Sequence, residues 1–557
     1  RGGGARPRRG SRQPRPRTGR AGPGHLGGRR RHPLRTDHQP RGTRTRRPDA
    51  RRLQGCAAEG RGEAGHQPQH PSQETSRTRP RRGRRTMSTR HIASLAASGL
   101  AMLLACSWPA AAAAPRPNIL LIVADDLGWG DVGWHDGFAK TPVMDRLVAE
   151  GVDLDRHYVQ PVCTPTRAAL LTGRYPGRFG PHVLAPSNRR ALPSGTATLA
   201  STLRSAGYTT FQTGKWHLGS RQEWGPNHYG FDHAYGTLTG AADPWTHKYR
   251  RGPYEDTWHR DGERLDEEGN ATELVAAEAV RRIREGADLR DAGGKRRPWL
   301  LYVAFHAVHT PVDAPEAFKR LYDGVRFDSD PARHDSRLRM AAMVSQLDAK
   351  VGEMIAALDA TDQRENTLVI FTSDNGGVES LKNAYVGNVP DSPLNSENDP
   401  LRGQKNTLWE GGVRVCAFAN WPGVLTPRTC PAVIHAADWF PTLAGLLELR
   451  QAQSLGWDGI DRWAAITGTG EAARPQPLCI AHNSGRAVYE SHRDGDWKLI
   501  LRKKGPALLY DLAADPYERH DLAGEQPQVV ERLRAFAKAD ARADVTNLPA
   551  DLRGTPR

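Results

Sequence analysis

The sequence predicts an α/β fold in which a large mixed, mostly parallel sheet is sandwiched by helices, followed by a small C-terminal α+β domain. From Asn118 onward, short apolar β-rich runs alternate with helical stretches, which is the pattern of strands joined by covering helices. After about Gly468 this alternation ends and the apolar runs become shorter. No internal repeat is visible in the sequence, so a repeat architecture is not indicated.

Three apolar runs are the clearest strands of the predicted sheet: residues 118–123, 299–305 and 367–372. Each run is short, rich in Leu, Ile, Val or Phe and bounded by polar residues, as expected for a buried strand. Helical patterns cover residues 274–283 and 336–358. These five elements form the framework of the large domain.

The chain of 557 residues is long enough for one large domain and a smaller one. We expect the large domain over residues 115–468 and the small one over 469–557. In the small domain, residues 497–501 and 508–512 have the pattern of antiparallel strands, and 527–541 that of a helix.

The net charge of +17 is concentrated in residues 1–86, which hold 25 arginines and only five acidic residues. This segment lacks Ile, Val, Phe, Trp, Tyr and Met, so it cannot bury enough apolar surface to fold, and we expect it to be disordered. It has the composition of a nucleic-acid-binding arm. We favour a mis-called start site instead, and so expect no nucleic-acid partner.

A signal peptide is predicted over residues 87–114, beginning at Met87. A basic head is followed by an apolar run over residues 92–108 and by small residues at 110–114, the three-part pattern of export to the periplasm or the medium. The run is short for a transmembrane span, and no other stretch reaches about 18 apolar residues. The Leu-Leu-Ala sequence before Cys106 also resembles a lipoprotein cleavage box.

Six cysteines give little disulfide framework. Cys56 and Cys106 lie in segments that we expect to be absent or removed. An oxidising compartment would permit one bridge among Cys416, Cys430 and Cys479, and the sequence does not choose the pair.

Polar side chains follow each of the three predicted strands directly. In open α/β sheets, ligands bind outside the carboxyl ends of the strands, so these residues indicate a site. The oxygen ligands among them suit a hard cation, Ca²⁺ best and Mg²⁺ as an alternative. Taken singly, each is equally typical of a helix cap or an ordinary turn. The oxygen-bearing set is Asp125, Asp126, Asp374 and Asn375.

Cys163 opens the segment Cys-Thr-Pro-Thr-Arg, which ends at Arg167. Proline just inside a run of helix formers places Cys163 at a helix N-terminus, where the helix dipole is expected to lower the pKa of a thiol. Arg167, one turn on, has the planar fork that binds an oxyanion. A buried structural cysteine beside a surface arginine is an equally good interpretation of these five residues alone.

The Cys-x-Pro-x-Arg segment is similar to the signature of the type I sulfatase family, whose cysteine is converted to formylglycine by a maturation enzyme. Thr166 stands where this family most often has serine or a small residue. The resemblance covers about residues 117–541, in family order, and is closest to the arylsulfatase B and N-acetylgalactosamine-sulfatase branch. Further matching blocks are residues 123–130, 207–219, 307–311, 372–377, 402–414 and 509–518.

The resemblance implies an alkaline-phosphatase-like fold and an enzyme that hydrolyses sulfuric esters of sugars or aryl alcohols. It implies a formylglycine from Cys163 that attacks sulfur, Lys215 on the sulfate oxygens, His217 as the base, and His309 with Lys405 on the leaving oxygen. Alternatives are a phosphodiesterase or phosphonate monoester hydrolase of the same superfamily and a catalytically silent sulfated-glycan binder. The implied catalytic residues are Cys163, Arg167, Lys215, His217, His309 and Lys405, and the implied metal ligands are Asp125, Asp126, Cys163, Asp374 and Asn375.

Overall fold

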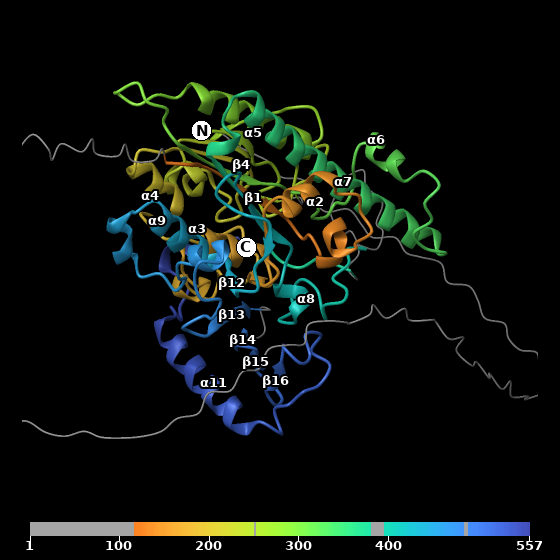
Figure 1. Ribbon diagram of the computed structural model, residues 1–557, viewed down its shortest axis with the longest axis vertical. Helices are drawn as coiled ribbons and strands as arrows, with labels where there is room; N and C mark the ends of the chain where they lie inside the picture. Colours follow the sequence, from red (N-terminus) through yellow and green to blue (C-terminus); the bar gives the residue numbers. More distant parts are fainter. Residues whose placement is uncertain (1–115, 250–251, 380–394, 484–487, 557) are drawn as a thin grey trace, which may run out of the picture. The chain divides into compact units, whose positions relative to one another are not determined.

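The computed structural model describes four segments of the chain: residues 116–249, 252–379, 395–483 and 488–556 (Figure 1). The chain divides into two compact units, residues 1–103 and 104–557, and the described residues belong to the second. The predicted leader and the predicted signal peptide lie outside the described residues. Export and the start site therefore stay predictions.

A large mixed sheet forms the centre of the second unit. Its five middle strands, β9 to β5 in spatial order, run parallel, whereas β10 and β6 are antiparallel to their neighbours. The three strands predicted from apolar runs are neighbours at its centre, so the predicted mostly parallel sheet is confirmed. In spatial order, the strands of this sheet in the described residues are β11 (Arg428–Thr429), β2 (Val152–Asp153), β10 (Ala417–Asn420), β9 (Thr367–Ser373), β1 (Asn118–Ala124), β8 (Trp299–Ala304), β4 (Thr209–Lys215), β5 (His233–Thr237), β6 (Trp258–Arg260) and β7 (Glu263–Arg264).

Helices cover both faces of this sheet because its central strands are apolar on both sides. Alternate residues of β1, such as Leu121 and Ile122, belong to two different hydrophobic clusters. One cluster includes α3 (Cys163–Thr172), α4 (Leu199–Ser205) and α9 (Trp439–Leu446). The other includes α2 (Pro142–Ala149), α5 (Ala271–Asp288) and α7 (Pro331–Ala360), the last two lying side by side in Figure 1. Both predicted helices are confirmed, within α5 and α7. No helix in the described segments combines the length and the apolar character needed to cross a bilayer.

The C-terminal region forms a four-stranded antiparallel sheet, which confirms the predicted small domain. Its strands are β13 (Leu478–Asn483), β14 (Val488–Asp494), β15 (Trp497–Leu501) and β16 (Leu508–Asp511), in that order. Helix α11 (Pro527–Asp540) packs Leu533 against Leu499 and Leu509. The other face lies against Tyr158, Tyr175 and Val413 of the large domain. The boundary predicted at residue 468 stays a prediction.

The described cysteines are all buried and all carry free thiols. The bridge that an oxidising compartment would permit among Cys416, Cys430 and Cys479 is therefore not formed.

Candidate active site

The candidate site lies at the carboxyl ends of β1 and β9. These two strands pair in parallel with Ala124 opposite Ser373, so the residues that follow them leave the sheet side by side. The Asp374 amide donates to the Ala124 carbonyl at 3.0 Å, and the Asp126 amide donates to Asp374 Oδ1 at 3.3 Å. Asp126 has a φ of 63°, in the left-handed region, which turns the chain back toward β9. The predicted meeting of these carboxylates at one sheet edge is confirmed.

Helix α3 begins at Cys163, as predicted, and every one of its residues is buried. The Thr166 hydroxyl donates to the carbonyl of Gln160 at 3.1 Å or of Val162 at 3.2 Å and accepts from the Gln160 amide at 3.0 Å. It thereby ties the segment that leads into Cys163 to the first turn of the helix. These hydrogen bonds require a hydroxyl group, and threonine has one, as serine does.

The environment of the Cys163 thiol differs from the prediction. Burial raises its pKa, although the nearby charges of Lys215 and Lys405 lower it. The expected lowering at a helix N-terminus was wrong because Cys163 is only 2% exposed, and desolvation penalises a buried thiolate more than these charges favour it.

Arg167 binds a carboxylate of the site with the fork that the sequence suggested for an oxyanion. Its Nε and Nη2 both donate to Asp374 Oδ2, at 3.0 and 2.8 Å, and both side chains are fully buried. Its Nη1 donates to the Lys215 carbonyl at 3.0 Å and to the Tyr302 hydroxyl at 3.4 Å. Arg167 therefore orients Asp374 and joins α3 to β4. Sequence reasoning missed Tyr302, which shows no signal beyond its place in a buried strand.

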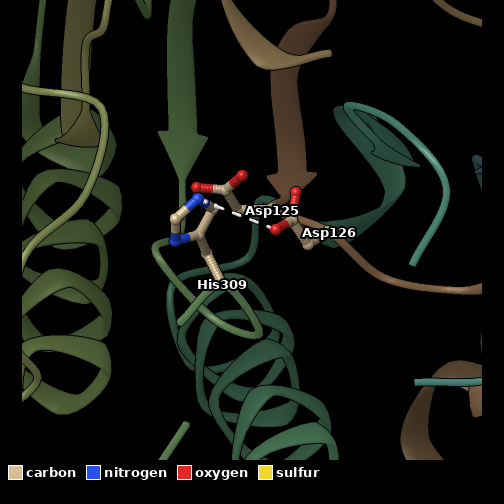
Figure 2. A group of neighbouring side chains, drawn as sticks. All are labelled: Asp125, Asp126 and His309. Atoms are coloured by element: carbon tan, nitrogen blue, oxygen red, sulfur yellow. Dashed lines mark ion pairs between the residues drawn. The ribbon is translucent and has the colours of Figure 1, made fainter. Parts of the chain in front are cut away.

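Two lysines and a histidine surround the remaining carboxylates. Lys215 Nζ lies 2.5 Å from Asp125 Oδ2, and Lys405 Nζ lies 2.5 Å from Asp126 Oδ1. His309 Nε2 faces Asp126 Oδ2 at 3.7 Å from the loop after β8 (Figure 2). Burial raises the pKa of Asp126, but the charge of Lys405 and its hydrogen bond outweigh burial and lower the pKa to about 2. Asp126 is thus ionised at neutral pH.

Asp374 has the opposite balance. Burial and the charge of Asp125 raise its pKa to about 6, against the lowering effects of Arg167 and Lys215. Three buried carboxylates at one sheet edge therefore repel one another, and positive charge placed among them would stabilise them all.

His217 enters the site by a turn and not by strand alternation. Strand β4 ends at Lys215, and His217 has a φ of 56°, in the left-handed region, so the two side chains do not share a face of an extended segment. A Cβ added to Gly240 would lie 2.3 Å from His217 Nε2, so only glycine leaves room for this ring. Burial, followed by the charge of Lys215, holds the pKa of His217 well below its usual range, and its Nδ1 has no hydrogen-bond partner among the described residues.

His306, which was left out of the predicted site, lies beside it. Its Nε2 shares a hydrogen bond of 2.7 Å with the Thr237 hydroxyl. Burial and the charges of Lys215 and Arg167 hold its pKa well below the usual range. Its position three residues before His309, after the same strand, was the signal for it.

The residues at this edge fit a hard divalent cation. Ligand atoms of Asp125, Cys163 and Asp374 lie within 4.8 Å of one another, and so do those of Asp125, Asp126 and His309. Asp125 Oδ1 and Asn375 Oδ1 are buried and accept no hydrogen bond from any described residue. A buried oxygen without a hydrogen-bond donor destabilises the folded protein unless a cation binds it instead.

Comparison with known proteins identifies the family of this chain. The model of the Sulfatase family matches residues 117–449. Mouse arylsulfatase J is 31% identical over 79% of this chain and 79% of its own length. N-acetylgalactosamine-6-sulfatase of the dog is 32% identical over 68% of this chain and 71% of its own length. The solved structure of Ps i-CgsB in complex with k-i-k-neocarrahexaose is 27% identical with a TM-score of 0.69, covering 77% of this chain and 94% of that one. The chain belongs to the sulfatase family and is an enzyme that hydrolyses sulfate esters.

Proposed function

We propose that this enzyme removes sulfate from a sulfated sugar or an aryl sulfate, using a formylglycine made from Cys163 and one divalent cation. We favour Ca²⁺ over Mg²⁺ as this cation. The observation that carries the proposal is the position of Cys163. It starts a buried helix, and its Sγ lies within 4.8 Å of carboxylate oxygens of Asp125 and Asp374. A nucleophile precursor beside a cluster of hard oxygen ligands suits metal-assisted attack on an anionic ester.

The residues that would hold the cation are Asp125, Asp126, Asp374, Asn375 and residue 163. Bound there, the cation would supply charge for the sulfate oxygens, and formylglycine would supply a hydrated aldehyde as the nucleophile. Modification of Cys163 requires a formylglycine-generating maturation enzyme as a partner of the newly made chain.

The remaining residues bind the sulfate and move protons. Lys215, fully buried, would hold a sulfate oxygen as a point charge. His217 is neutral in its buried position, the form that can accept a proton, and its Nδ1 has no hydrogen-bond partner among the described residues. Lys405 and His309, on the Asp126 side, would donate to the departing oxygen.

The state of His309 depends on what binds between the lysines. Burial lowers its pKa to about 3, and the charges of Lys405 and Lys215 lower it as well, whereas Asp126 raises it. A bound sulfate ester is anionic and opposes those two charges. The negative charge of the substrate therefore shifts the pKa of His309 upward, toward the protonated form that can donate.

Sulfated carbohydrate is the substrate class that we favour. One relative is named N-acetylgalactosamine-6-sulfatase, and one solved structure similar to this chain is a complex with k-i-k-neocarrahexaose. A panel of glycosaminoglycan and algal oligosaccharide sulfates, nitrocatechol sulfate and a phenyl phosphodiester tests the proposal. We expect sulfate release from the sulfate esters and a lower kcat/KM on the phosphodiester. A higher kcat/KM on the phosphodiester would favour the phosphodiesterase alternative, and no turnover by formylglycine-bearing protein would favour the silent binder.

Lys405→Ala and His309→Ala should lose more activity on a sugar sulfate than on an aryl sulfate. A sugar alkoxide needs a proton as it leaves, whereas a nitrophenolate does not, so a group on the leaving oxygen matters more for the sugar. We expect Lys405→Ala to cost about 3 kcal/mol of transition-state stabilisation on the sugar ester, the scale of one preorganised oxyanion donor. The measurement is kcat/KM of both variants on both esters, together with metal content.

Both variants should keep their metal, because neither residue is among the proposed oxygen ligands. Equal losses on the two esters, or loss of metal, would show that Lys405 and His309 do not act on the leaving group.

A further inference from the structure

Both ends of the segment that carries Lys405 are attached to one residue of the C-terminal region, Glu518. The Arg402 side chain donates through Nη1 to the Glu518 carbonyl at 2.6 Å. The Glu410 amide donates to Glu518 Oε2 at 2.7 Å. The segment between them is closed at its base, where the Gly411 amide donates to the Arg402 carbonyl at 2.8 Å. Lys405 therefore lies in a loop whose two ends are both attached to Glu518.

A buried group of charges holds Glu518 in place. Lys498 Nζ, on β15, lies 2.8 Å from Glu410 Oε1 and 2.8 Å from Glu518 Oε1. The three residues are at most 1% exposed. The Tyr158 hydroxyl donates to the other oxygen of Glu410 at 2.5 Å. We name Glu410, Lys498 and Glu518 the C-terminal clamp.

Glu410 carries a negative charge in the clamp, whereas burial raises the pKa of Glu518. Burial raises the pKa of Glu410, but Lys498 and Arg493 outweigh it and lower the pKa to about 2, so this carboxylate is ionised. A buried ion pair contributes little to stability compared with apolar residues of the same volume, since desolvation of both charges opposes their attraction. The clamp joins three separate segments, because Glu410 ends the Lys405 loop, Lys498 lies on β15 and Glu518 follows β16.

Lys405 needs a fixed geometry because a lysine side chain is long and flexible. Its ammonium lies 2.5 Å from Asp126 Oδ1, and its amide donates to the Gly377 carbonyl at 3.1 Å. The next residue, Asn406, has a φ of 69° and donates its amide to the Pro161 carbonyl, close before Cys163. A shift of this loop would move the ammonium away from the carboxylate that it faces, and a displacement of about 1 Å at a reacting centre is costly.

We infer that the C-terminal clamp positions Lys405 for catalysis, which makes Glu518 a positioning residue of the active site. This inference rests on the proposed function for the assignment of Lys405 to the leaving oxygen. It gives the small C-terminal domain a catalytic task, because β15 and the segment after β16 hold a loop of the large domain from which an active-site lysine extends.

The test is a double-mutant cycle between residues 518 and 405. We expect Glu518→Ala to lower kcat/KM about 10-fold on a sugar sulfate and much less on an aryl sulfate, in keeping with a small misplacement of a catalytic group. In a Lys405→Ala background the same substitution should have no further effect. Glu518→Gln keeps an acceptor for the Glu410 amide and should restore most of the loss. Metal content should stay unchanged throughout.

A matched control detaches the C-terminal region at another point. Arg178 is 7% exposed and pairs with Asp540 and Asp544, at and beyond the end of α11, far along the chain from the Lys405 loop. Arg178→Met should lower the melting temperature without favouring either ester. Arg402→Met, at an exposed position, removes the other attachment to residue 518 and should repeat the Glu518→Ala pattern even where that variant folds poorly.

Two outcomes would overturn the inference: equal losses on both esters for Glu518→Ala and Arg402→Met, or an undiminished Glu518→Ala effect in the Lys405→Ala background. The Lys405→Ala single variant separates this from the proposed function. If the Lys405→Ala variant loses equal activity on both esters, the proposed role of Lys405 at the leaving oxygen is wrong. The coupling between residues 518 and 405 in the double-mutant cycle still tests whether the clamp positions Lys405.

Discussion

Replacing Cys163 by alanine is expected to abolish sulfate release while the protein stays folded. Without a sulfur at position 163 no formylglycine can form, and the remaining site has no nucleophile. The substitution removes one atom from a buried position at the start of α3, so its structural cost is small. The measurements are turnover of an aryl sulfate, the thermal melting temperature, and the mass of the peptide containing residue 163 in wild-type protein made with the maturation enzyme.

Cys430→Ala is the matched control. Cys430 is also fully buried, and its thiol contacts the Ala465 carbonyl at 3.5 Å, among none of the residues proposed for catalysis. This variant should keep its activity. Wild-type protein that is fully active with only a thiol at position 163 would contradict the proposed nucleophile.

The core of the fold could be predicted because its signal is local. The run at residues 118–123 is apolar at every position after Asn118, and β1 does occupy the centre of the sheet with both faces covered. The position of Asp125 and Asp374 follows from the same fact. Residues that follow neighbouring parallel strands must meet at one edge, whatever the rest of the chain does.

The partners within the site could not be predicted, because they depend on contacts between distant segments. The sequence places Arg167 one turn after Cys163, but it does not show that Asp374, 207 residues away, takes the guanidinium. The turn at His217 depends on a left-handed backbone conformation and on the space left by Gly240. Both depend on which distant residues pack together, and the sequence does not show which ones they are.

The C-terminal clamp is the feature that the sequence predicts least. Its charges come from a short helix, from β15 and from the segment after β16, and Glu518 and Glu410 are 108 residues apart. In the sequence, Lys498 stands between apolar residues of a strand. The alternation of side chains along a strand would ordinarily place such a lysine on the solvent-exposed face of the sheet. Only the three-dimensional structure shows that it is buried between two carboxylates.

Asp374→Ala should cost activity by several powers of ten and lower the metal content at the same time. The proposed ligands act as a unit, because a cation that loses one carboxylate is held less tightly and supplies less charge to the sulfate. The same change leaves the buried guanidinium of Arg167 without its carboxylate, and breaking such a pair costs about 3–5 kcal/mol of stability. Elemental analysis, kcat/KM and the melting temperature with and without added Ca²⁺ are the measurements.

Asp374→Asn separates the two effects. The amide keeps an oxygen for Arg167 and the shape of the side chain, so this variant should fold better than Asp374→Ala yet still bind metal weakly, because its charge is lost. Added Ca²⁺ should raise the melting temperature of the wild-type protein, and this rise should be smaller in both variants. A ligand that binds the folded state more weakly stabilises it less. Full metal content in both, with activity lost, would mean that Asp374 serves Arg167 and not the cation. Activity that survives complete chelation would remove the metal from the proposal.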